Sequence, residues 1–479
     1  MNSPTEQNAE SVLSALAEIF DSSRIKTDKE SQQIYGTDWT RAYTANPVAV
    51  VFPISIIEVQ SLVRLANKQR FALVPSGGRT GLSGGAVANN SEVVVAFDKM
   101  NKILEFDSIG RQLVCEPGVI TEQIHQFAEE NDLFYPVDFA SSGSSQIGGN
   151  VATNAGGIKV IRYGLTRQWV LGLKVVTGNG ELLDLNRGLI KNATGYDLRH
   201  LFIGSEGTLG LIVEVTLGLT IPPKDPTVLL LAVEDLNATM KVLQTFQQEL
   251  VLSAFEFFSE EALGHVLEEK QLQRPFDTKA PFYVLIEIEN DNDSTNDQVM
   301  ELFEKCMEPG WVLDGTISQT SEQYMNLWRL REDISETISR FTPYKNDISV
   351  KVSKVPEFLA QVDELVSDQY PDFEIIWFGH IGDGNVHLNI LKPSTLDKED
   401  FYQRCATVSE KVYALVKEYG GSVSAEHGVG LLKKPFLRFT REPQEIAYMQ
   451  AIKKVFDPNS VLNPGKIFEI LPDSNDSIS

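Results

Sequence analysis

The sequence predicts an α+β fold with more than one domain. Up to residue 221, short β-prone runs alternate with glycine-rich loops and a few helices. The segment TIPPKDP then brings Pro222, Pro223 and Pro226 close together, which disfavours regular structure and marks a domain boundary. After this boundary, longer amphipathic helices are separated by strands, an order typical of a second α+β domain with antiparallel pairing.

Before the boundary, the predicted strands are FALVP, EVVVAF, QLVCEPG, VLGLKVVTG and LGLIVEVTL, and the clearest helix is ITEQIHQFAEEN. We expect an N-terminal helical segment over residues 1–42 and the first domain over residues 43–224. The remaining residues of this part form loops that are unusually rich in glycine.

After the boundary, we expect helices near residues 237–250, 260–269, 323–340 and 398–419, and strands at FYVLIEIE and EIIWFGH. Gly420 and Gly421 end the last of these helices. The second domain then covers residues 225–428, a C-terminal helical segment covers residues 429–470, and the tail 471–479 is expected to be disordered.

Composition excludes several classes of protein. The 479 residues carry a formal net charge of -24 and a pI near 4.7, which argues against nucleic acid or an anionic membrane surface as partner. Cys115, Cys306 and Cys405 are widely spaced, so neither a disulfide framework nor an iron–sulfur cluster is predicted. No apolar run approaches the ~20 residues of a membrane span, and no Lys or Arg precedes Arg24. We therefore expect a soluble cytoplasmic protein.

Three glycine-rich loops predict a ligand site in the first domain. PSGGRTGLSGGA follows the strand FALV, and SSGSSQIGGNVATNAGG and LFIGSEGTLG come later. Glycine lets backbone N–H groups approach and converge on phosphate oxygens. The first loop lacks the G-x-G-x-x-G spacing and leads to a strand, so a nicotinamide Rossmann site is not expected. Three such loops favour a large extended ligand held by backbone amides, the alternative being that they are turns alone.

The histidines predict a second site. In GHIGDGNVHLNI, Asp383 and Gly384 indicate a two-residue hairpin turn. Such a turn places His380 opposite His387, with Asn389 on the same face and the two Cβ atoms roughly 5 Å apart.

With Glu426 from the later motif SAEHG, these histidines make three N/O ligands and leave one position open. That pattern is typical of a catalytic divalent metal. The alternative is a cross-strand histidine pair, with Glu426 and His427 in an unrelated loop.

Together, PSGGRTGLSGGA, IGGNVATNAGG, KNATGYDLRHLFIGSEGTLG, GHIGDGNVHLN, SAEHGVG and NPGK resemble the FAD-linked D-2-hydroxy-acid dehydrogenases of the vanillyl-alcohol oxidase superfamily. The resemblance covers about residues 35–468 and is strongest to the branch that acts on D-2-hydroxyglutarate. It implies a PCMH-type FAD-binding domain of two α+β subdomains, an antiparallel-sheet cap domain with helices, and a C-terminal helical segment that returns to the FAD domain.

The resemblance also implies roles for individual residues. The FAD would be non-covalent, because the first loop has Arg79 and no histidine. FAD would contact Ser76, Gly77, Gly78, Arg79, Thr80, Gly81, Leu82, Gly85, Gly143, Ser144, Gly148, Asn150, Gly156 and Glu206. His380, His387 and Glu426 would bind a divalent metal, Zn²⁺ with Mn²⁺ or Co²⁺ as alternatives, and His427 would be the catalytic base. Substrate would contact Arg331, Ser335, Lys345 and Asn389; Ser335 stands where the family usually has threonine.

The expected reaction is oxidation of a D-2-hydroxy acid, with D-2-hydroxyglutarate first and D-lactate, D-malate or glycolate as alternatives. A metal-dependent hydrolase and a non-catalytic flavin electron-transfer subunit are the rival classes. The expected electron acceptor is an electron-transfer flavoprotein or a quinone. The oligomeric state stays open, with a homodimer among the options.

Overall fold

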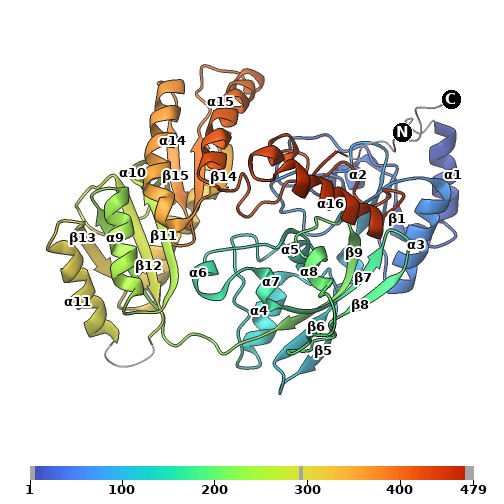
Figure 1. Ribbon diagram of the computed structural model, residues 1–479, viewed down its shortest axis with the longest axis horizontal. Coiled ribbons are helices and arrows are strands. Elements are labelled where there is room, and N and C mark those ends of the chain that lie inside the picture. Colours follow the sequence, from blue (N-terminus) through green and yellow to red (C-terminus); the bar gives the residue numbers. More distant parts are fainter. Residues whose placement is uncertain (1–5, 291–294, 470–479) are drawn as a thin grey trace. The chain divides into compact units, whose positions relative to one another are not determined.

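The structure is a computed structural model that describes residues 6–290 and 295–469, so the predicted tail 471–479 lies outside the described residues. Its elements are helices and strands in both halves of the chain, which confirms the α+β prediction (Figure 1). Contacts divide the chain into two units. The first comprises Met1–Gly156, Leu165–Ile221 and Glu426–Ser479, and the second comprises Gly157–Gly164 and Pro222–Ala425.

The first unit contains a four-stranded sheet of order β1-β2-β4-β3. The strands β2, β4 and β3 are parallel, and β1 joins antiparallel at the edge. Strand β4 has the sequence VVVA and is buried throughout, as expected for a parallel strand covered on both faces. The elements of this part are α1 (Glu6–Leu16), η1 (Ser22–Arg24), β1 (Ile25–Lys26), α2 (Lys29–Tyr35), β2 (Ala49–Val51), α3 (Ile56–Gln69), β3 (Leu73–Ser76), β4 (Val93–Ala96) and η2 (Phe97–Lys99). Strand β3 leads directly into the first glycine-rich loop.

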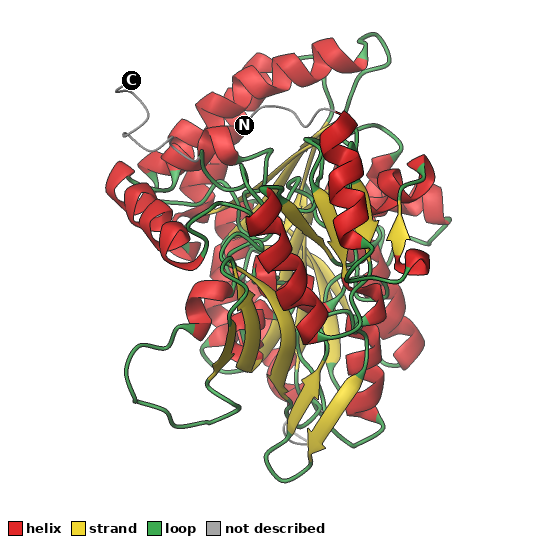
Figure 2. Ribbon diagram, turned by 90° about the vertical axis from the view of Figure 1, so that its right-hand side faces the viewer, coloured by secondary structure: helices red, strands yellow, loops and turns green. Residues whose placement is uncertain are grey.

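A five-stranded antiparallel sheet of order β5-β6-β9-β7-β8 completes the β structure of this unit (Figure 2). Helix α5 buries Ile147 and Val151 against its core, which also contains Tyr135 and Phe202. The elements are β5 (Ile103–Asp107), β6 (Gln112–Cys115), α4 (Thr121–Glu129), α5 (Ile147–Thr153), α7 (Thr166–Trp169), β7 (Val170–Thr177), β8 (Leu182–Leu185), α8 (Arg199–Phe202) and β9 (Gly210–Gly218). The second glycine-rich segment therefore contains a helix.

The C-terminal segment belongs to the same unit and contains η4 (Lys434–Phe439) and α16 (Pro443–Phe456). Backbone hydrogen bonds of 2.7 Å join Leu73 to Val461 and to Asn463. The segment 461–463 therefore pairs with the edge strand β3 and extends the sheet. The buried ammonium of Lys453 donates to the carbonyl oxygens of Thr208 and Leu462, each at 2.7 Å. These bonds anchor α16 to the segment that precedes β9.

The second unit is built on a seven-stranded antiparallel sheet of order β13-β10-β12-β11-β15-β16-β14. Its strands are β10 (Thr227–Val233), β11 (Leu252–Ser259), β12 (Phe282–Ile288), β13 (Val312–Ile317), β14 (Tyr344–Ser349), β15 (Ile375–Gly379) and β16 (Asn385–Ile390). Its helices are α9 (Leu236–Gln247), α10 (Glu260–Lys270), α11 (Thr295–Met307), α12 (Ser321–Glu332), α13 (Ile334–Ser339), η3 (Val352–Lys354), α14 (Val355–Gln369) and α15 (Lys398–Glu418).

Helices cover both faces of this sheet. On one face, Leu327 and Trp328 of α12 and Ile334 of α13 pack in a core with Phe258 and Phe378. On the other face, the hydroxyls of Ser409 and Tyr413 in α15 donate to the side-chain oxygen of Asn346 in β14. Helices α14, α9 and α11 continue the layer of α15 (Figure 1).

The short segment Gly157–Gly164 packs with the second unit although both of its flanking segments belong to the first. Its helix α6 (Val160–Tyr163) follows Lys159, whose ammonium lies 2.9 Å from the carboxylate of Glu287 in β12. Glu287 is fully buried and also accepts hydrogen bonds from Tyr324 and Trp328. This buried ion pair explains why the segment groups with the second unit.

The register of the β15–β16 hairpin differs from the prediction. Phe378, not His380, lies opposite His387, and the loop comprises residues 380–384. Of the two predicted turn residues, Gly384 has a positive φ of 88° but Asp383 does not, so the turn is not type I′. The Asp383 carboxylate accepts a hydrogen bond from the backbone N–H of Asn385, which stabilises the wider loop. Because the shift is two residues, His380 and His387 still share one face.

The predicted helix at 323–340 is also interrupted. It divides into α12 and α13 at Asp333, so Arg331 and Ser335 lie on successive helices. At Asp333 the backbone has φ -72° and ψ -7°. This ψ departs from the α-helical value of about -42°, so α12 ends where α13 begins. Within the described residues, no helix is both long enough and apolar enough to cross a membrane.

Candidate active site

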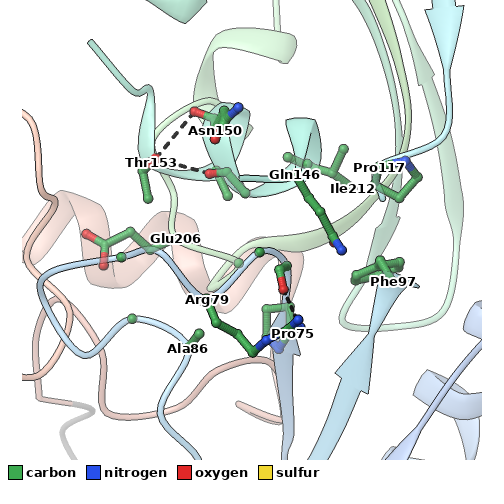
Figure 3. A pocket seen from close by; sticks show the side chains of 18 of the residues that line it. Pro75, Arg79, Ala86, Phe97, Pro117, Gln146, Asn150, Thr153, Glu206 and Ile212 are labelled. Atoms are coloured by element: carbon green, nitrogen blue, oxygen red, sulfur yellow. Dashed lines mark hydrogen bonds between the residues drawn. The ribbon is translucent and has the colours of Figure 1, made fainter. Parts of the chain in front are cut away.

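A pocket lies in the first unit, where the glycine-rich loops meet. Gly78 shows how closely they approach, because a Cβ atom there would lie 2.2 Å from the carbonyl oxygen of Ser144. No side chain larger than hydrogen fits at this position. Figure 3 shows the first loop with Arg79 on one wall of the pocket and Gln146 and Asn150 on another.

Most of the predicted cofactor residues line this pocket. Those that do are Gly77, Gly78, Arg79, Thr80, Gly81, Gly85, Gly148, Asn150 and Glu206. The predicted residues that are not part of its lining are Ser76, Leu82, Gly143, Ser144 and Gly156. Of these, Ser76 lies between the lining residues Pro75 and Gly77, and its hydroxyl is buried without a hydrogen-bond partner.

The pocket suits a large ligand recognised mainly by backbone groups. Arg79 donates to the carbonyl of Gly77 at 2.6 Å, lies near Asp98 and stacks over Tyr35, so its charge is engaged within the protein. The side-chain oxygen of Gln146 is buried, lines the pocket and has no hydrogen-bond partner. A pocket with glycine walls and unsatisfied polar atoms fits a dinucleotide such as FAD.

Glu206 has a contact that the sequence did not predict. Its two carboxylate oxygens accept the backbone N–H groups of Val429 and Gly430, at 2.7 and 2.8 Å. Burial raises the pKa of the Glu206 carboxyl, and these two hydrogen bonds oppose the rise. Glu206 therefore secures the turn that follows His427, and His427 itself lines the pocket.

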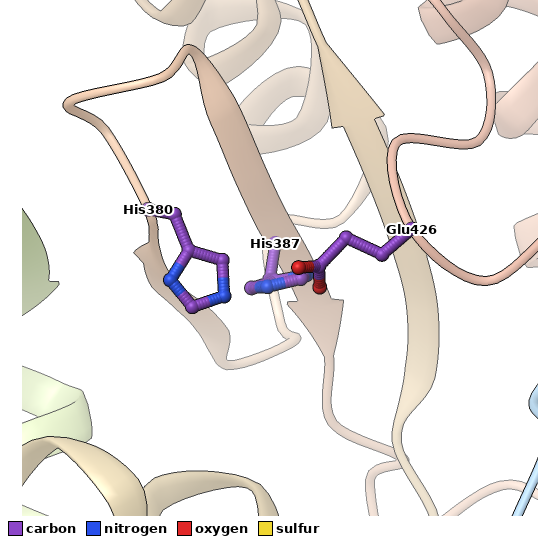
Figure 4. Close-up of side chains that lie close together, drawn as sticks. All are labelled: His380, His387 and Glu426. Atoms are coloured by element: carbon purple, nitrogen blue, oxygen red, sulfur yellow. The ribbon is translucent and has the colours of Figure 1, made fainter. Parts of the chain in front are cut away.

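The second candidate site contains the three predicted metal ligands (Figure 4). One ligand atom from each of His380, His387 and Glu426 lies within 4.8 Å of the others. The two imidazole rings are 5.6 Å apart and nearly perpendicular, at 82°. Glu426 follows Ala425, whose backbone N–H bonds to the carbonyl of Asp347 in β14.

Each histidine has a carboxylate behind it. Nδ1 of His380 lies 2.8 Å from Glu256, and Nδ1 of His387 lies 3.8 Å from Asp347. Metal-binding histidines commonly have a hydrogen-bonded carboxylate partner, as His380 has in Glu256, and this partner orients the ring and leaves Nε2 for the ion. Two imidazoles and one carboxylate with this support fit a divalent metal such as Zn²⁺.

The backbone at Glu426 and His427 is irregular. Neither residue lies in a strand, and Gly428 has a φ of 79°. The left-handed residue lets the chain turn sharply, so the two adjacent side chains need not alternate as they would in a strand. Glu426 thus joins the metal group while His427 lines the glycine-walled pocket.

The four predicted substrate residues occupy the second unit. The ammonium of Lys345 donates to the hydroxyl of Ser335 at 2.9 Å, and Lys345 is the register partner of Asn389. The side-chain amide nitrogen of Asn389 is buried without a partner, as is Nε of Arg331. Desolvation lowers the pKa of Lys345. Unsatisfied buried donors of this kind are costly unless a ligand accepts from them.

Comparison with known proteins identifies the family. Residues 47–186 match the model described as an FAD binding domain, and residues 222–467 match the model described as the C-terminal domain of FAD linked oxidases. The second match alone covers more than half of the chain. The chain belongs to the FAD-linked oxidases.

Curated relatives of this FAD-linked oxidase include two named for the same substrate. A D-2-hydroxyglutarate dehydrogenase of Stutzerimonas stutzeri (strain A1501) is 58% identical over 457 residues, covering 95% of this chain and 98% of the relative. A mitochondrial D-2-hydroxyglutarate dehydrogenase of Arabidopsis thaliana is 37% identical over 468 residues, covering 96% and 82%. These similarities confirm that the chain is an FAD-dependent dehydrogenase acting on a CH–OH group.

Solved structures confirm the PCMH-type fold of this FAD-linked oxidase. The 4-ethylphenol oxidase from Gulosibacter chungangensis has a TM-score of 0.77 at 17% identity and covers 98% of this chain and 99% of its own. The p-cresol methylhydroxylase has a TM-score of 0.76 at 14% identity, covering 98% of both chains. At these identities, the likeness concerns the fold alone.

Sequence reasoning missed much of the apolar lining of the flavin pocket in this FAD-linked oxidase. The missed residues include Pro75, Phe97, Pro117, Leu211 and Ile212. In the sequence, such residues cannot be told from core residues, because both sit in β-prone apolar runs. Gln146 could have been found, since it lies inside the motif SSQIGGN between residues that were predicted.

Proposed function

We propose that this dehydrogenase oxidises D-2-hydroxyglutarate to 2-oxoglutarate. The observation that carries the proposal is the set of donors on one face of the second unit's sheet: Lys345, Asn389 and the buried arginine Arg331. Two basic side chains and a buried amide suit a substrate with two carboxylates. The names of the relatives support this choice over D-lactate, D-malate or glycolate, which offer a shorter chain or fewer carboxylates.

Each group in the proposal has one task. FAD held by the glycine-rich loops would supply the acceptor for the hydride that leaves C2. A divalent metal, which we propose to be Zn²⁺ held by His380, His387 and Glu426, would supply a Lewis acid beside the substrate hydroxyl.

The chain's own residues do the rest. His427 accepts the hydroxyl proton through an imidazole nitrogen, because it is the titratable side chain next to the ligand Glu426 that also lines the flavin pocket. Arg331 offers its unpaired Nε–H to a carboxylate, and Asn389 offers its unpaired amide N–H. Lys345 adds a positive charge that Ser335 orients. An electron-transfer flavoprotein or a quinone then reoxidises the enzyme.

The test is anaerobic bleaching of the flavin absorbance by a panel of 2-hydroxy acids. The panel contains the D and L enantiomers of 2-hydroxyglutarate, malate and lactate, together with glycolate. We expect D-2-hydroxyglutarate to bleach the flavin fastest and its L enantiomer not at all. Faster bleaching by D-lactate or glycolate would assign the enzyme to another substrate of the same class.

A further inference from the structure

Glu256 connects the two halves of the proposed site. It lies in β11, its side chain is 1% exposed, and none of the sequence motifs contains it. Its Oε1 lies 2.8 Å from Nδ1 of His380, and its Oε2 lies 2.8 Å from an Nη2 of Arg331. One carboxylate thus contacts both a proposed metal ligand and a proposed substrate residue, and all three belong to the second unit.

The contact with His380 determines which nitrogen can bind a metal. A carboxylate accepts hydrogen bonds only, so Nδ1 of His380 must carry a proton to complete this bond. The neutral imidazole then has its lone pair on Nε2, which is the form that ligates a metal. Glu256 therefore holds the ring of His380 in its metal-binding tautomer.

The contact with Arg331 determines the direction of the guanidinium. Arg331 lies over the ring of Phe378, 4.9 Å from its centroid, and the ion pair with Glu256 fixes one edge of the guanidinium plane. Its Nε remains buried without a partner. Although the ion pair between Arg331 and Glu256 is close, Oε2 of Glu256 accepts no hydrogen bond of good geometry. The guanidinium is thus held by charge and stacking, with a donor left for a ligand.

We propose that Glu256 is a positioning residue that couples metal binding to recognition of the substrate carboxylate. The proposal rests on the function proposed above. The two contacts of Glu256 explain why glutamine cannot replace it. A glutamine that accepts from His380 must turn its NH₂ toward the cation of Arg331, whereas one that accepts from Arg331 must donate to Nδ1 and so place the imidazole proton on Nε2. Either orientation sacrifices one partner.

The test compares Glu256→Gln with Glu287→Gln in the flavin-loaded enzyme. Glu287 is a matched control, because it is a buried glutamate on the neighbouring strand β12 that contacts neither His380 nor Arg331. Two quantities are measured: the Kd of Zn²⁺ for the chelator-stripped enzyme, and KM and kcat for D-2-hydroxyglutarate. Thermal unfolding reports on any general loss of stability.

We expect Glu256→Gln to weaken Zn²⁺ binding or raise KM by about 10- to 100-fold, as loss of such a supporting partner does elsewhere. Glu287→Gln should lower the melting temperature and leave both constants unchanged. Unchanged Zn²⁺ binding and KM in Glu256→Gln would overturn the proposal, as would equal losses in Glu287→Gln.

If Glu256→Gln does not fold, Arg331→Met answers the same question. Without the arginine, the negative charge of Glu256 is no longer shared and acts on His380 alone, which favours a bound cation. The Kd of Zn²⁺ should therefore fall by at least about threefold. An unchanged Kd would contradict the coupling. His380→Ala separates this result from the proposed function. If it still binds Zn²⁺ like the wild type, the metal site itself is wrong, whatever Glu256 does.

Discussion

The ammonium group of Lys345 donates a 2.9 Å hydrogen bond to the hydroxyl of Ser335. This bond joins strand β14 to helix α13 and holds a lysine in a mostly buried position, where desolvation lowers its pKa. A lysine in such a place is costly unless it serves a ligand. The bond therefore supports a carboxylate-binding role for Lys345.

Lys345→Met should raise KM for D-2-hydroxyglutarate by roughly 10- to 100-fold, because a hydrogen bond to a charged group contributes about 1.5–3 kcal/mol. Steady-state kinetics measure the effect. Lys354→Met is the control, since Lys354 is about half exposed and pairs with Glu357 on the surface. If Lys345→Met leaves the kinetics on the five-carbon diacid unchanged, Lys345 does not bind the substrate.

Gly149→Leu should abolish FAD binding without unfolding the protein. Gly149 lies in helix α5 and lines the flavin pocket, and a Cβ atom at this position would have no neighbour within 4 Å, so a leucine enters the pocket rather than the core. The flavin content of the purified protein is measured by absorbance. Gly264→Leu is matched, because Gly264 is also helical with open space around it and lies outside the pocket. Normal FAD content in Gly149→Leu would show that FAD binds elsewhere.

Glu206→Gln should slow flavin reduction by roughly 10- to 100-fold. The NH₂ group of the glutamine would face one of the two backbone N–H groups that now donate to the carboxylate, so one hydrogen bond would be lost. The turn after His427 loses a constraint, and His427, the proposed base, is then less well placed. Stopped-flow absorbance gives the rate, and the FAD content should stay normal. The control is Glu214→Gln, which removes a glutamate of β9 that pairs with Lys174. The flavin of this variant should be reduced at the wild-type rate. A wild-type rate in Glu206→Gln would refute the positioning role.

The stability of the protein should depend on pH through Lys466. Burial lowers the pKa of Lys466 to about 8, and its ammonium donates to the carbonyl of Val87. Below pH 8 the folded state carries the full cost of the buried charge, and this cost disappears as pH rises toward the unfolded pKa of 10.5. The contribution of Lys466 to the free energy of unfolding should therefore increase between pH 8 and 10.5, by at most ~3 kcal/mol.

Denaturant unfolding of the wild type and of Lys466→Met at pH 7 and pH 10 measures this contribution. The wild type should gain stability relative to the variant at the higher pH. A difference between the two proteins that stays constant with pH would mean that the pKa of Lys466 is not lowered by folding.

The sequence predicted the classes of structure and the motifs better than the register and the long-range contacts. Asp383 and Gly384 correctly indicated a turn, but the pairing of Asn385 with the Asp383 side chain widened the loop and moved His387 opposite Phe378. Period-two alternation cannot detect such a shift, because a slip of two residues leaves every side chain on its face.

Glu256 and Glu206 show the limit more clearly. Each is a single glutamate whose partners lie far away in the sequence: Arg331 and His380 for one, and the turn after His427 for the other. No local pattern distinguishes such a glutamate from one on a solvated surface. The proposed metal ligands could be named from the sequence, because His380 and His387 share a hairpin motif and Glu426 lies in the second histidine motif, SAEHG.

The most direct test of the account is the rate of anaerobic flavin reduction by D-2-hydroxyglutarate in three samples of one preparation: the enzyme as purified, the enzyme after chelation, and the chelated enzyme after Zn²⁺ is restored. All three must retain FAD, which absorbance verifies. We expect rapid reduction, then a large loss of rate, then recovery, with no recovery in the His387→Ala variant. An unchanged rate after complete removal of metal would contradict a metal-assisted oxidation at His380, His387 and Glu426.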